Sequence, residues 1–181
     1  MFLFGINFLN IPFTFILIRN FQWRTKLAYT RKEYIGSTPQ SKIKIFEAGD
    51  PNAEYNYEIT LKTKDNCEIR SSALESIRLH INRNLTWKLA KSKFFFKIPI
   101  YPHQIVRSHG WLGFAGADRI SKGMKLAFGK PKDRVAKVKK GQTVIFVRVL
   151  NKEDVDAVRD ILKGAIKKIP GNGEIVTKKI R

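Results

Sequence analysis

The sequence holds a single cysteine, Cys67, so the chain can form no internal disulfide and no metal cluster built from its own thiolates. Cys67 lies between Asn66 and Glu68 in an acidic stretch, which is expected to raise the pKa of its thiol. A raised pKa leaves little thiolate for catalysis, and we therefore interpret Cys67 as a structural residue. A chain without disulfides is typical of the reducing cytoplasm.

Acidic residues are also scarce. There are 15 aspartates and glutamates against 35 lysines and arginines, which leaves a formal net charge of +20 on 181 residues. Residues 78–148 carry seventeen basic side chains and only two acidic ones. Such a surface attracts polyanions. Nucleic acid is favoured over an anionic membrane, because membrane-binding clusters are usually short and lie beside an apolar anchor.

Motifs for catalysis or nucleotide binding are missing. His103, His109 and Asp118 lie near one another in the sequence, but their spacing matches no metal-ligand motif. The glycines form neither a G-x-x-x-x-G-K-[ST] loop nor a G-x-G-x-x-G turn between a strand and a helix. We therefore expect no enzyme activity, no catalytic residue, no metal, no cofactor and no small-molecule substrate.

The first eighteen residues lack charge altogether. A secretory signal would need a positive n-region and a small-residue cleavage site, and neither is present. A membrane span needs roughly 20 apolar residues, whereas Asn7 and Pro12 interrupt this run. We interpret residues 1–18 as an extension of doubtful role outside the functional domain; a membrane anchor or an apolar arm on a partner stays open. Residues 19–49 are predicted to form a basic N-terminal arm, and residues 50–181 the folded domain.

Beyond residue 50 the spacing of apolar residues predicts four strands and two main helices. In order, they are strand 56–63, helix 72–90, strand 93–101, strand 142–150, helix 151–170 and strand 174–180. This order indicates a single α+β domain with a mixed sheet rather than a doubly wound α/β fold.

Each predicted helix has one apolar stripe that would face the core. In the first helix Ser72 and Glu75 have the spacing of a capping box. The second has acidic residues in its first turns and is stopped by Pro170 and Gly171. The two stripes are Leu74, Ile77, Ile81, Leu85 and Leu89, and Val155, Val158, Leu162, Ala165 and Ile169.

The stretch between these elements, residues 109–142, is basic and broken by six glycines. Glycine lets the backbone approach phosphates and adopt positive φ, and lysine and arginine neutralise phosphates. Trp111, Phe114 and His109 have flat side chains that can stack on unpaired bases. A DNA-reading protein would more typically have a recognition helix or a dimer seam. The segment is therefore typical of a surface fitted to folded RNA.

Five motifs resemble, in order and spacing, the large-subunit ribosomal proteins of the universal L-sixteen family, in its archaeal and eukaryotic L-ten-e branch. They are YTRKEYI (29–35), YPHQIVR (101–107), AGADR (115–119), GM (123–124) and AFGKP (127–131). The resemblance covers about residues 24–179. It departs from the family after AFGKP, where Asp133 and Arg134 stand in place of a usual Gly-Thr pair. The loop 108–114 is also less polar at its start than in the family, and residues 1–18 have no counterpart there.

The resemblance implies an α/β-hammerhead-like domain between the central protuberance and the peptidyl-transferase region, holding rRNA helices together. It implies a monomer within the cytoplasmic ribosome, whose partners are large-subunit rRNA, tRNA acceptor ends and neighbouring ribosomal proteins. A stand-alone RNA-processing enzyme and a membrane-tethered RNA-binding protein are the alternatives.

We expect two sets of binding residues. The residues expected to bind rRNA are Arg24, Lys26, Arg31, Lys32, Arg119, Lys122, Lys125, Lys130, Lys132, Arg134 and Lys137. The loop expected near tRNA consists of Arg107 at its base, then Ser108, His109, Gly110, Trp111, Leu112, Gly113 and Phe114.

Overall fold

Alternating apolar residues place β3 (Tyr57–Thr63) at the interior of a sheet. Ile59 and Leu61 are fully buried on this strand, which pairs with β8 (Thr143–Val149) on one side and β9 (Gly173–Lys179) on the other. The computed structural model describes residues 29–30, 33, 35–89, 93–108 and 129–180. In this part of the chain the strands are β1 (Tyr29–Thr30), β2 (Glu47–Gly49), β3 (Tyr57–Thr63), β4 (Cys67–Arg70), β5 (Phe94–Lys97), β6 (Gln104–Ser108), β7 (Lys130–Val138), β8 (Thr143–Val149) and β9 (Gly173–Lys179). The helices are α2 (Ser71–Lys88) and α4 (Glu153–Ile166).

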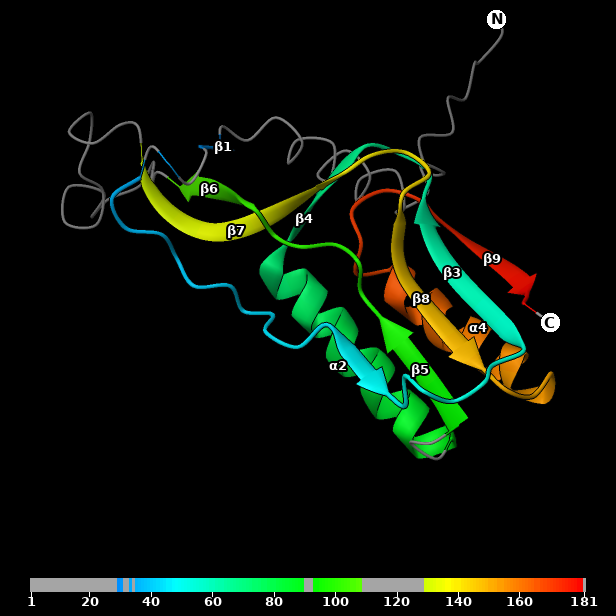
Figure 1. Ribbon diagram of the computed structural model, residues 1–181. Coiled ribbons are helices and arrows are strands. Elements are labelled where there is room, and N and C mark those ends of the chain that lie inside the picture. Colours follow the sequence, from blue (N-terminus) through cyan, green and yellow to red (C-terminus); the bar gives the residue numbers. More distant parts are fainter. Residues whose placement is uncertain (1–28, 31–32, 34, 90–92, 109–128, 181) are drawn as a thin grey trace, which may run out of the picture.

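The strands form two sheets, with the orders β1-β6-β7-β4 and β2-β5-β8-β3-β9. Figure 1 shows both helices behind the five-stranded sheet. The long, curved β7 belongs to the four-stranded sheet and ends at the turn that leads into β8. The predicted α+β class with two main helices is confirmed. In place of one mixed sheet, the described strands make two sheets in which every pair is antiparallel.

One hydrophobic core joins the two sheets and the helices. It includes Ile69 of β4 and Ala136 of β7 from the four-stranded sheet, together with Phe96 of β5, Leu74 of α2 and Leu162 of α4. Buried side chains of both predicted stripes belong to this core. Because the core is continuous, the described chain packs as a single domain.

The first predicted helix is confirmed as α2, but its predicted capping box is wrong. The N-cap is Arg70, which makes no side-chain capping hydrogen bond, and Glu75 instead binds the guanidinium of Arg78 at 2.6 and 2.9 Å. The hydroxyls of Ser71 and Ser72 both lie against the carboxylate of Asp133 in β7. A carboxylate from another strand thus stands at the helix N-terminus, where the helix dipole favours a negative charge, and local capping is replaced by a tertiary contact.

The second predicted helix is confirmed as α4, which ends at Ile166, four residues before Pro170. Its first turn carries Glu153, Asp154 and Asp156, as the dipole favours. Where α4 crosses α2, Gly164 lies under the ring of His80, and a Cβ at Gly164 would be 2.8 Å from the His80 Nε2. The absence of a side chain at this position therefore lets the two helices pack closely.

Two of the predicted strands differ from their prediction. The strand predicted over 93–101 ends at Lys97, after which the chain leaves the five-stranded sheet and enters the four-stranded sheet as β6. Pro99 and Pro102 lie in this crossing, and neither has an N–H to donate to a ladder. The final predicted strand, 174–180, is confirmed as β9, which begins and ends one residue earlier.

The predicted basic arm, residues 19–49, is described in part. Ile43 is buried in the core, and β2 pairs with β5, with Gly49 opposite Phe95. Gly49 has φ of 100°, and a Cβ there would lie 2.0 Å from the carbonyl oxygen of Phe94. The close approach of the two strands therefore requires glycine at this position. How far residues 19–49 act as a separate arm stays a prediction, and the extension 1–18 lies outside the described residues.

Candidate nucleic-acid interface

A line of lysines follows β7 and the turn after it. Lys130, Lys132 and Lys137 are exposed on the strand, and Lys139 and Lys140 are exposed in the turn. We call these five residues the basic strip. Buried Val135, Ala136 and Val138 anchor the same strand in the interior. The first three lysines of the strip are therefore held on a paired strand, which presents their charges in a fixed order.

A bulge in the β6–β7 pair changes the direction of β7 at the first lysines of the strip. Val106 pairs with Asp133 and Arg107 pairs with Pro131, so Lys132 is the extra residue on β7. Such a bulge bends a strand and increases its twist. Pro131 fits this place because a proline has no N–H for the ladder.

The predicted tRNA-proximal loop begins where β6 ends. Ser108, the last residue of β6, lies opposite Lys130, the first residue of β7. The two residues that flank the segment 109–129 therefore lie at the same end of the four-stranded sheet. Arg107 is half-buried and Ser108 exposed at the base of the loop. The rest of the predicted loop, residues 109–114, lies outside the described residues.

Arg134 differs from the lysines of the strip because its guanidinium is engaged within the fold. Its Nε donates to the carbonyl oxygen of Pro39 at 2.7 Å, and its Nη2 lies 3.5 Å from the Thr38 hydroxyl. These contacts hold the segment before β2 against β7.

Asp133, next to Arg134, makes a second junction. Its carboxylate accepts hydrogen bonds from the Ser71 hydroxyl at 2.6 Å and from the backbone N–H of Arg134 at 2.8 Å. The Ser71 oxygen in turn lies 3.5 Å from the backbone N–H of Lys42. The Asp133-Arg134 pair, which departs from the resembled family, therefore joins β7, the start of α2 and residues 38–42.

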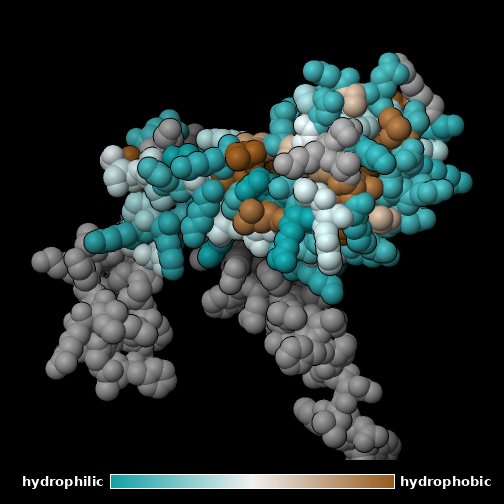
Figure 2. Space-filling view, turned by 90° about the horizontal axis from the view of Figure 1, so that it is seen from below, coloured by the Kyte–Doolittle hydropathy of each residue, from teal (hydrophilic) through white to brown (hydrophobic). Residues whose placement is uncertain are grey.

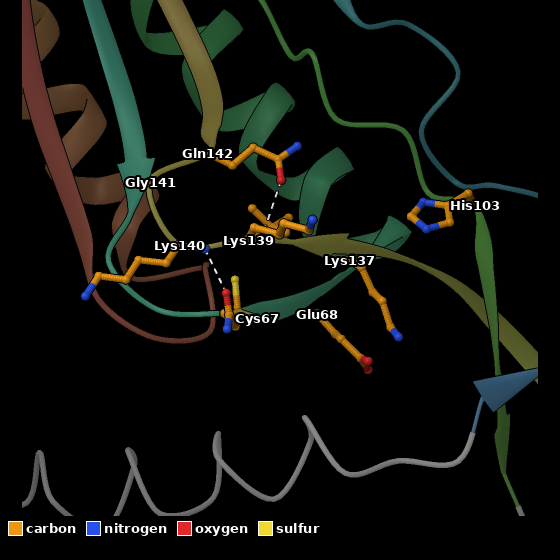
Figure 3. Close-up of a pocket in the computed structure, with 10 residues that line it drawn as sticks. Cys67, Glu68, His103, Lys137, Lys139, Lys140, Gly141 and Gln142 are labelled. Carbon is orange, nitrogen blue, oxygen red and sulfur yellow. Dashed lines mark hydrogen bonds between the residues drawn. The ribbon is translucent and has the colours of Figure 1, made fainter.

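A shallow hollow of about 1040 Å³ lies beside the second half of the strip (Figure 3). Its walls come from residues 66–68, His103 and residues 137–142. The side chains of Glu68 and Lys137, which face each other across the β4–β7 pair, point the same way, out of the sheet. Lys137 and Lys139 against one carboxylate leave the hollow positive, while the Lys140 side chain points away from the other lining residues.

The hollow keeps its shape through hydrogen bonds around the turn. The backbone N–H of Lys140 donates to the Asn66 side chain at 2.8 Å, and that of Lys139 donates to the Gln142 side chain at 3.0 Å. Gly141 has φ of 78° and donates its N–H to the carbonyl of Thr63. The backbone donors are therefore used within the turn, which fixes the backbone that carries the exposed Lys139 and Lys140 side chains.

Cys67 lies at the back of the hollow and is buried. Burial, with smaller contributions from the charges of Asp65 and Glu68, raises the pKa of its thiol to about 11. Burial also raises the pKa of the Glu68 carboxyl. The expected direction of the Cys67 shift is confirmed, and the thiol stays protonated at neutral pH.

His103 does not form a metal site with other described residues. Its ring Nδ1 lies 3.2 Å from the carbonyl oxygen of Tyr101, and its backbone N–H donates to Val135. Within the described part of the chain no cluster of three His, Cys, Asp or Glu side chains is suited to a metal ion. His109 and Asp118 lie outside that part.

The structure brings four of the predicted rRNA-binding residues together on β7: Lys130, Lys132, Arg134 and Lys137. The others, Arg24, Lys26, Arg31, Lys32, Arg119, Lys122 and Lys125, lie outside the described residues. Sequence reasoning did not single out Lys139 and Lys140, although both belong to the glycine-broken basic segment and their position next to Gly141 was a usable signal.

Comparison with known proteins decides the family. The family model for ribosomal protein L16p/L10e matches residues 24–176. The chain belongs to this family. The family resemblance inferred from the five motifs is thereby confirmed.

Curated relatives agree with this assignment. The large ribosomal subunit protein uL16 of Hyperthermus butylicus is 39% identical over 142 residues, covering 78% of each chain. The uL16 proteins of Saccharolobus islandicus and Saccharolobus solfataricus are 42% and 43% identical over 144 and 145 residues, covering 79% of this chain and 81% of theirs. In the described part of this L16p/L10e chain, no helix is long and apolar enough to cross a membrane.

Proposed function

We propose that the chain is a structural constituent of the large ribosomal subunit that binds rRNA near the peptidyl-transferase region and helps to position tRNA acceptor ends. In this proposal it works as a monomer on the cytoplasmic ribosome, in contact with neighbouring ribosomal proteins. The observation that carries the proposal is the basic strip, which this member of the L16p/L10e family holds on β7 and the turn after it.

The strip has the chemistry for backbone recognition. Lysine is a strongly hydrated point charge on a flexible stem, and it neutralises phosphates without reading base identity. From Lys130 to Lys137 an extended strand spans roughly 23 Å at about 3.3 Å per residue. A strand of this length, followed by Lys139 and Lys140 at the hollow, supports contact with several phosphates of a folded RNA.

The loop after β6 is proposed to approach tRNA. Because Ser108 and Lys130 pair, the base of the loop is fixed in the four-stranded sheet beside the strip. A loop held this way can extend from an rRNA-bound domain without disturbing the core. Its tRNA role comes from the family resemblance, and we assign it positioning rather than catalysis.

Membership of the L16p/L10e family favours a structural ribosomal role over a stand-alone RNA-processing enzyme or a membrane-tethered protein. The relatives are named large ribosomal subunit protein uL16, and this chain matches them over most of their length. The proposed role needs no catalytic group, since rRNA binding rests on charge and shape.

Salt dependence of rRNA binding by the purified chain tests the proposal. If six or more basic side chains contact phosphates, affinity falls by roughly 10³ or more between 50 and 200 mM salt. The double variant Lys130→Ala/Lys132→Ala is expected to reduce the slope of log K against log salt by about 1.4–1.8, at about 0.7–0.9 per phosphate contact. Lys152→Ala, an exposed lysine next to α4, is the matched control and should leave the slope unchanged. A shallow slope, or equal effects of both variants, would contradict the role of the strip.

A further inference from the structure

The outer side of α2 carries an exposed tryptophan that the fold does not use. Trp87 is 86% exposed, although large aromatic side chains are usually well buried in folded domains. Leu79, two turns earlier on the same side of the helix, is 52% exposed. The buried stripe of α2, which includes Ile77, Ile81 and Leu85, faces the core instead. Trp87 therefore contributes little to the core that holds the domain together.

The neighbours of Trp87 are polar and basic rather than apolar. Arg83 is exposed one turn before it, and Thr86 and Lys88 are exposed beside it. In Figure 2 the described surface is largely hydrophilic, with hydrophobic side chains gathered in a few separate patches. The core of a protein–protein interface is depleted in charged residues, whereas sites for single-stranded nucleic acid combine an exposed aromatic side chain with a positive groove.

A hollow of about 500 Å³ lies along α2 between Ser72 and Arg83 and can serve as the positive groove of such a site. Lys42, Arg83 and Lys168 line it, together with Glu75, whose carboxylate is bound by Arg78. The Lys168 ammonium is held in place by the Ser76 hydroxyl and carbonyl, each 3.0 Å from its Nζ. The hollow thus holds three cationic groups around one carboxylate that is already neutralised.

The spacing along the helix matches an extended nucleic-acid strand. At about 1.5 Å per residue, Leu79 at the hollow and Trp87 are about 12 Å apart along the helix axis. Arg83 lies midway between them and lines the hollow itself. A few consecutive nucleotides can place a phosphate in the hollow and a base on the indole.

We propose that this side of α2 is a second rRNA contact, separate from the basic strip, in which a phosphate lies among Lys42, Arg83 and Lys168 and an unpaired base stacks on Trp87. The contact rests on the proposed function, because rRNA is its partner. It gives the domain two separate points of attachment, on β7 and on α2, and so fixes the orientation of the domain on the RNA as well as its position.

Affinity for a short RNA tests the stacking. The full-length chain is titrated with a twelve-nucleotide oligoadenylate, and Trp87→Ala is expected to weaken binding by about 5- to 150-fold, the usual range for loss of one base–aromatic stack. Trp87→Phe should restore most of the affinity because it keeps an aromatic face. Thr86→Ala is the matched control at an exposed neighbouring position and should bind normally. Equal affinity of Trp87→Ala and the unchanged chain would overturn the stacking.

Crosslinking in the assembled particle tests the partner. Trp87→p-benzoylphenylalanine is introduced in cells, large subunits are purified and irradiated, and the crosslinked product is identified. A crosslink to an rRNA nucleotide supports the contact, while a crosslink to a ribosomal protein, or none, overturns it. If the chain enters large subunits in either case, the proposed function stands independently of this contact. If the chain is absent from them, both fail.

Discussion

Replacing Arg134 separates a residue that holds the fold together from the exposed lysines of β7 that we propose to bind RNA. The guanidinium donates to the Pro39 carbonyl at 2.7 Å from a half-buried position on β7. A hydrogen bond from a charged donor contributes about 1.5–3 kcal/mol, and partial exposure of the side chain favours the lower end. Arg134→Ala is therefore expected to cost about 1.5 kcal/mol of unfolding free energy. At about 2–4 °C per kcal/mol for a domain of this size, Tm falls by about 3–6 °C.

Two further variants sharpen the comparison. Lys132→Ala removes an exposed side chain, so its Tm should change by less than about 2 °C, while the salt slope of rRNA binding falls by about 0.7–0.9. Arg134→Lys keeps the charge but loses the planar fork that reaches Pro39 and Thr38, so it should lose stability while keeping the salt slope.

Thermal unfolding followed by circular dichroism and filter binding at several salt concentrations give the two readouts. The reasoning is refuted if Arg134→Ala unfolds at the temperature of the unchanged chain, or if its salt slope falls as far as that of Lys132→Ala. Either result would place Arg134 with the lysines that we propose to bind RNA, rather than with a role in holding residues 38 and 39 against β7.

Two other variants test the packing. Gly49→Ala should lower the free energy of unfolding by at least about 2 kcal/mol, because positive φ disfavours alanine by about 1–2 kcal/mol and the new Cβ would meet the Phe94 carbonyl oxygen at 2.0 Å. Gly36→Ala is the control, since a Cβ at Gly36 would have no atom within 4 Å. In urea unfolding its stability should be within about 0.5 kcal/mol of that of the unchanged chain. Burial, and then the charge of Lys168, lower the pKa of His80 in the folded chain, so the unfolded state binds the proton more tightly; stability should be full above the ordinary histidine pKa of about 6.5 and decline as pH falls below it. His80→Gln should weaken that decline in urea unfolding at pH 7.5, 6.5 and 5.5, and an unchanged pH dependence would contradict this cause.

Local periodicity was enough to predict the elements whose burial pattern is regular. In β3 and α4 the apolar residues recur at the period of the element, and both elements lie where the sequence places them, although α4 ends early. β7 was missed because its sequence, KPKDRVAKV, combines a proline with five charged residues, and its strand form depends on pairing with β6 and β4. β4 is short, and its pairing with β7 is set by residues nearly seventy positions away.

The sequence predicted the type of site, but it did not predict the role of each residue in it. Composition and motifs indicated the basic segment and the family, but they could not distinguish Arg134, which binds Pro39, from Lys132, which faces solvent. The same limit affected Ser72, whose spacing to Glu75 suggests local capping while its hydroxyl contacts Asp133. Trp87 lies off the apolar stripe predicted for this helix, a signal for exposure that the sequence analysis did not use, and the structure shows that it is exposed. Tertiary neighbours decide these roles.

Sedimentation of cell extract tests the central claim most directly. The tagged full-length chain is followed through sucrose gradients at low and at high salt, with rRNA and membrane markers measured in the same fractions. A structural constituent of the large subunit is expected to co-migrate with large-subunit rRNA at low salt and to be released only as high salt screens its phosphate contacts. A chain that stays at the top of the low-salt gradient, or that pellets with membranes, would contradict the account.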